Sequence, residues 1–128
     1  MPERACPETG ATTLRQTASK VTDDVGALCR LTLGPQDQLR GPADVSNVVA
    51  SLSLAASLLP QLFGQLAVFL EVEYVKGTIA PGPGAGQQVR AVSDALHRAG
   101  LDAEAMAAAL AAAREASTHL QALAPRND

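Results

Sequence analysis

The sequence predicts an all-α protein, a small antiparallel helical bundle of three to four helices with a kinked central helix. Alanine supplies 25 of the 128 residues, whereas Phe, Tyr and Trp together supply three. A core of Ala, Leu and Val favours closely packed helices over sheets. Apolar residues recur at alternating spacings of three and four along segments that glycine and proline separate, as expected for one face of a helix. We predict one helical domain over 11–124, with disordered tails at 1–10 and 125–128.

The first helix is predicted over residues 11–33. Its apolar or small residues fall on one face at Leu14, Ala18, Val21, Val25, Leu28 and Thr32. Gly34-Pro35 should end it, because glycine favours the C-terminal cap and proline cannot continue a helix. Residues 34–43 hold a second Gly-Pro step and are predicted to form a loop.

The central helix is predicted over residues 43–76. Pro42 suits the first turn, and Asp44 complements the positive helix N-terminus. Residues 45–70 carry no charged side chain, and Pro60 lies inside this run. A proline in a helix interior removes one backbone hydrogen bond. We therefore favour a kink or short break at Pro60, with two separate helices as the alternative.

Residues 70–79 allow two interpretations. Residues 70–75 partly alternate apolar with charged side chains, as a strand does, and Lys76-Gly77 could turn this strand back as a hairpin. A lone hairpin is marginally stable in water, and no other segment predicts a strand. We therefore favour a helix that continues to about Lys76 and is capped by Gly77.

The last helix is predicted over residues 87–123, after a Gly/Pro-rich loop at 77–86. Its stripe of three-four spacing consists of Val89, Val92, Leu96, Ala99, Ala103, Met106, Leu110, Ala113, Ser117 and Leu120. The stripe passes through Gly100, which favours one long helix, because a glycine there costs only about 1 kcal/mol relative to alanine. The alternative is two helices, with Gly100 as C-cap and Asp102 as N-cap.

Composition argues against several classes of partner. The net charge is −3 and no run of Lys or Arg occurs, whereas nucleic-acid binding requires a basic surface. Cys6 and Cys29 lack metal-binding spacing and are predicted to be free thiols. Residues 1–10 do not form a signal peptide, so we expect a cytoplasmic protein. Eight arginines against two lysines, with abundant Ala, Gly and Pro, indicate a GC-rich bacterial genome.

No motif predicts an enzyme, a metal site or a cofactor. The glycines of residues 82–86 precede a helix, but a phosphate-binding loop would also need a preceding strand and a Gly-Lys-Ser/Thr ending. Glu115 and His119, like Asp94 and His97, share a helix face. Two ligands do not make a metal site, and bundle metal centres use several such pairs. We therefore expect a non-enzymatic protein without catalytic, cofactor or metal residues.

The functional prediction comes from the charge-free segment 45–70. We predict a protein-protein interaction module, either self-associating as a homodimer or acting as an adaptor, because uncovered apolar surface marks interaction sites. The chain's three aromatics lie in or beside this segment, and aromatics are favoured interface anchors. The candidate contacts are Phe63, Leu66, Phe69 and Tyr74. The alternative is a small membrane-associated accessory protein anchored through 45–70, since about 20 apolar residues suffice to cross a bilayer.

Overall fold

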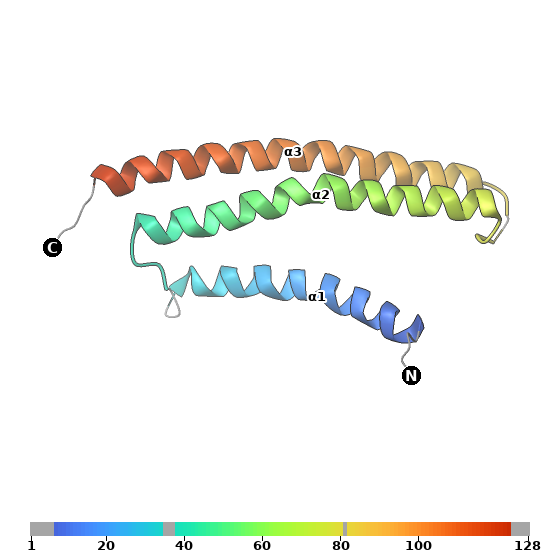
Figure 1. The fold of residues 1–128 in the computed structure, drawn as a ribbon, viewed down its shortest axis with the longest axis horizontal. Helices are drawn as coiled ribbons and strands as arrows, with labels where there is room; N and C mark the ends of the chain where they lie inside the picture. Colours follow the sequence, from blue (N-terminus) through green and yellow to red (C-terminus); the bar gives the residue numbers. More distant parts are fainter. Residues whose placement is uncertain (1–6, 35–37, 81, 124–128) are drawn as a thin grey trace. The chain divides into compact units, whose positions relative to one another are not determined.

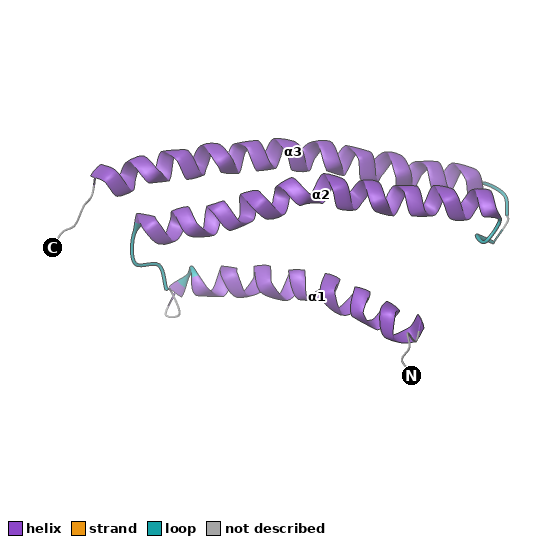
Figure 2. Cartoon of the chain, in the orientation of Figure 1, coloured by secondary structure: helices purple, strands orange, loops and turns teal. Residues whose placement is uncertain are grey.

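The chain folds into three α-helices (Figures 1 and 2). The computed structural model describes residues 7–34, 38–80 and 82–123. Within these ranges the helices are α1 (Pro7–Leu31), α2 (Pro42–Lys76) and α3 (Ala85–Leu123), and no residue is in a strand. The all-α prediction is therefore confirmed, with three helices rather than four. The chain divides into two compact units, 1–40 and 41–128, and one helical domain over 11–124 stays a prediction.

The first unit contains α1. This helix begins at Pro7, inside the stretch that we predicted as a tail, because the fixed φ of proline suits the first helical position. The remainder of both predicted tails, residues 1–6 and 125–128, lies outside the described residues. Lys20 and Asp24, one turn apart, form an exposed ion pair at 2.9 Å. Such pairs stabilise a helix by about 0.3–0.5 kcal/mol.

Both ends of α2 follow from local chemistry. Pro42 occupies the first turn, with Asp44 close behind it. At the other end Gly77 adopts a left-handed backbone with φ of 81°. Its N–H donates to the Tyr74 carbonyl oxygen at 3.1 Å, and the Thr78 N–H donates to the Glu73 carbonyl oxygen at 3.0 Å. This pair of hydrogen bonds is typical of a helix C-terminus that is capped by glycine. The helical interpretation of 70–76 is confirmed, and the hairpin alternative is wrong.

Pro60 does not divide α2. The helix is continuous from Pro42 to Lys76 with Pro60 inside it, so the structure supports three helices rather than four with a kink, and our prediction of a kinked central helix is not what is found. An interior proline costs about 3 kcal/mol. Packing against α3 offsets this cost: the backbone of Gly100 approaches Pro60 so closely that an added Cβ would lie 3.5 Å from the Pro60 Cα.

The second unit is an antiparallel pair of long helices, α2 and α3 (Figure 1). The contacts show that the two helices run in opposite directions. Pro60 lies against Gly100, and Ser53, earlier in α2, donates a hydrogen bond of 3.3 Å from its hydroxyl to the carbonyl oxygen of Ala107, later in α3. α3 is one helix that continues through Gly100. The prediction of one long final helix is confirmed.

Candidate functional site

The seam between α2 and α3 is built from small residues. The buried positions are Ser46, Ala56 and Ala67 on α2 and Ser93, Gly100, Ala103 and Ser117 on α3. Positions that recur every seven residues on the two helices face each other, as Pro60 faces Gly100 and Tyr74 faces Gly86. Seven-residue spacing keeps one face of a helix against its partner over several turns. Small side chains in this seam let the two backbones approach closely.

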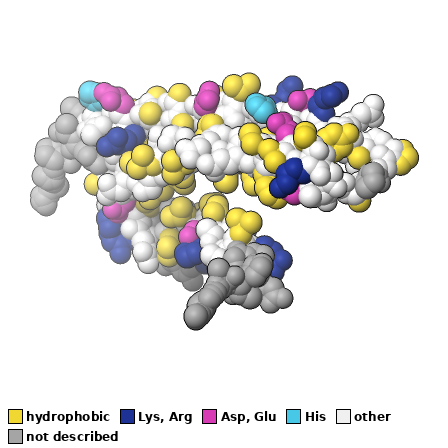
Figure 3. Space-filling view, turned by 45° about the vertical axis from the view of Figure 1, so that its right-hand side comes forward, with side chains coloured by type: hydrophobic (Ala, Val, Ile, Leu, Met, Phe, Trp, Pro, Cys, Tyr) yellow, Lys and Arg dark blue, Asp and Glu magenta, His cyan; other side chains and the backbone are white. Residues whose placement is uncertain are grey.

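Small residues occupy the buried positions of the seam and large side chains such as Phe63 and Leu70 are half-buried beside it, whereas other large apolar side chains of α2 are exposed. Leu54 is 69% exposed, Phe69 is 61% exposed and Leu62 is 45% exposed. At 100° per residue these positions lie on the side of α2 that faces away from α3. We define the outer face of α2 as Leu54, Leu58, Leu62, Leu66, Phe69 and Val72, all of which are exposed. Figure 3 shows hydrophobic side chains reaching the molecular surface.

The structure divides the four predicted contact residues between these two surfaces. Leu66 and Phe69 belong to the outer face. Phe63 is half-buried and follows the buried Ala56 by seven residues, which places it beside the seam. Tyr74 covers Gly86, where an added Cβ would lie 2.7 Å from the tyrosine hydroxyl. Leu66, Phe69 and Tyr74 are therefore exposed, although Tyr74 also contacts α3, and Phe63 is half-buried beside that contact.

A shallow polar groove lies beside the end of the seam near Tyr74. It has a volume of about 600 Å³, and its polar lining includes Glu71, Arg90, Ser93, Asp94 and His97. The Ser93 side chain is buried, and its hydroxyl donates to the Glu71 carboxylate. Nδ1 of His97 lies 2.9 Å from the Ser93 carbonyl oxygen. A carbonyl oxygen only accepts, so Nδ1 is the donor in this contact.

This groove does not arrange Ser93 as a nucleophile for the imidazole of His97. An activated serine needs an accessible hydroxyl that donates to a base such as an imidazole, whereas the Ser93 hydroxyl is buried and engages Glu71. The contact instead gives the buried hydroxyl a partner, which a buried polar group requires. Sequence analysis missed the pair, although the antiparallel arrangement with Pro60 opposite Gly100 places Glu71 near Ser93.

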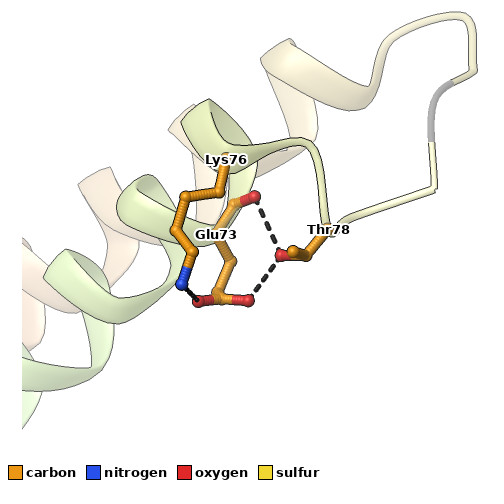
Figure 4. A network of polar contacts seen from close by, with 3 residues as sticks. All are labelled: Glu73, Lys76 and Thr78. Atoms are coloured by element: carbon orange, nitrogen blue, oxygen red, sulfur yellow. Dashed lines mark hydrogen bonds and ion pairs between the residues drawn. The ribbon is translucent and has the colours of Figure 1, made fainter.

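A second polar cluster closes the C-terminus of α2 (Figure 4). The Thr78 hydroxyl contacts the Glu73 carboxylate and its backbone carbonyl oxygen, and Lys76 Nζ lies 3.3 Å from Glu73 Oε2. The Thr78 hydrogen bond, followed by the interactions with Lys76, lowers the pKa of Glu73 below its ordinary value. Both interactions favour the charged carboxylate. The cluster is surface-exposed and serves as a helix cap.

The described residues contain no group of three or more His, Cys, Asp or Glu side chains that could hold a metal ion. Asp94 and His97 both line the polar groove. Cys29 is an exposed free thiol, and Cys6 lies outside the described residues. The outer face of α2 is therefore the candidate functional surface that the geometry favours.

One described helix, α2, is long and apolar enough to cross a membrane. Its most apolar 18-residue window has a mean hydropathy of 1.5 and is 11% buried. Length and composition of this kind are weak support for a membrane span, because core helices of other proteins share them.

Comparisons with known proteins identify no relative. No protein-family model, no curated protein and no solved structure matches the chain. A function for this chain therefore has to be argued from its own surface.

Proposed function

We propose that this chain is a non-enzymatic helical protein-protein interaction module that acts in the cytoplasm, either by self-association or as an adaptor. The outer face of α2 is the binding surface, with Leu62, Leu66 and Phe69 near its centre. The supporting observation is the inverted distribution of side chains in the α2–α3 pair. The buried positions of its seam are Ser, Ala and Gly, while the outer face exposes six large apolar residues.

The size of the exposed apolar surface supports this proposal. The exposed fractions of the six outer-face side chains together equal a little more than three whole side chains. Full burial of one Leu, Val or Phe contributes about 1.5–3 kcal/mol, so covering this face would contribute roughly 5–10 kcal/mol from this chain alone. A contiguous apolar surface of this kind on a small domain marks an interaction site.

The charges of α3 weigh against the alternative, a membrane-associated accessory protein anchored through 45–70. The pairing of Pro60 with Gly100 sets Arg98, Asp102 and Glu104 beside the middle of the charge-free segment. A span that kept α3 packed on α2 would carry these side chains to the centre of the bilayer. Insertion there costs about 2.5–3.5 kcal/mol for each Arg, Lys or Asp. Spanning would thus require the α2–α3 pair to separate.

Site-specific photocrosslinking in intact cells tests the proposal. A photoreactive phenylalanine derivative replaces Leu62 or Phe69 in the full-length chain, one position at a time. The matched control carries the same derivative in place of Leu101, which is on α3 and 66% exposed. We expect irradiation to give protein adducts from positions 62 and 69 and not from the control position.

The adducts distinguish the candidate functions. Adducts to a polypeptide at 62 and 69 alone support the interaction module. Adducts to lipid at those positions would replace it with the membrane alternative. The absence of any adduct above the level at position 101 would overturn the proposal. Circular dichroism of each variant should show unchanged helix content, because both replaced side chains are exposed.

A further inference from the structure

We draw no further inference here: the strongest candidate, the shallow groove beside the α2–α3 seam, is lined by Glu71 and Asp94 together with Arg90 and His97, so its mixed charge does not indicate the chemistry of a ligand and nothing in the structure shows what covers it.

Discussion

Replacing Gly100 by alanine should stabilise the protein, although this glycine is buried in the α2–α3 seam. An added Cβ would lie 3.5 Å from the Pro60 Cα and 3.8 Å from its Cβ. These distances are ordinary van der Waals contacts, so a methyl group fits without moving either helix. Gly100 also lies in a regular helix and is not among the described glycines with positive φ, so no backbone strain opposes the substitution.

The magnitude has two parts. Exchange of glycine for alanine inside a helix gains about 0.5–1 kcal/mol, because the unfolded chain loses backbone freedom. The new methyl group is buried against Pro60 and adds up to about 0.8 kcal/mol. The total of roughly 1–2 kcal/mol corresponds to a rise in Tm of about 4–8 °C for a chain of this size.

Urea denaturation followed by far-UV circular dichroism measures this effect, at one fixed protein concentration because self-association would shift the midpoint. Gly64→Ala is the matched control: its Cβ would meet nothing within 4 Å, so it should gain only about 0.5–1 kcal/mol. Gly100→Leu should lose about 1–3 kcal/mol, because the Pro60 backbone occupies the space that the longer side chain needs. A destabilised Gly100→Ala, or a neutral Gly100→Leu, would refute the packing of α3 on Pro60.

Three further predictions concern the polar contacts of α2. The pKa of Glu73 is lower in the folded protein, so its contribution to stability is complete above the unfolded pKa near 4.5 and is lost as the pH falls through the folded pKa. Thr78→Val should raise the Glu73 pKa in an NMR titration. An unchanged pKa would contradict the role of the Thr78 hydroxyl. Gly77→Ala should cost about 1 kcal/mol in thermal unfolding, because φ of 81° strains any residue with a Cβ. Ser93→Ala should cost about 0.5–1.5 kcal/mol. In a Glu71→Ala background, which removes the acceptor, the same cost would show that the two side chains are not coupled.

The ends of the helices could be predicted because they depend on neighbouring residues. Gly77 caps α2 and Pro42 begins it, as local chemistry requires. The continuity of α3 through Gly100 could also be predicted, because the alternating spacing of three and four between its apolar residues continues unchanged across that position. Continuity through Pro60 could not be predicted, because a proline's cost is local whereas the packing that offsets it comes from α3, forty residues away along the chain.

The candidate site was predicted only in part. The apolar segment was identified from its lack of charge. The sequence did not show which of Phe63, Leu66, Phe69 and Tyr74 face α3. All four are large and apolar or aromatic, so composition gives no contrast between them. Tyr74 contacts Gly86 and is also 45% exposed, so its predicted role as a partner contact stays a prediction. A glycine seven residues before Ser93 and fourteen before Gly100 was the available signal for that contact.

The sequence by itself determined the all-α fold class and, within a few residues, the ends of the helices, because helical periodicity and the backbone preferences of glycine and proline act over a few residues; it left the number of helices at three to four. Only the tertiary structure decided which side of α2 is covered. A helix that is apolar on most sides has no single favoured inner face. The buried positions of the α2–α3 contact are serine, alanine and glycine, because these small side chains let the two helices approach closely, and large side chains such as Leu62 and Phe69 are exposed on the other side of α2.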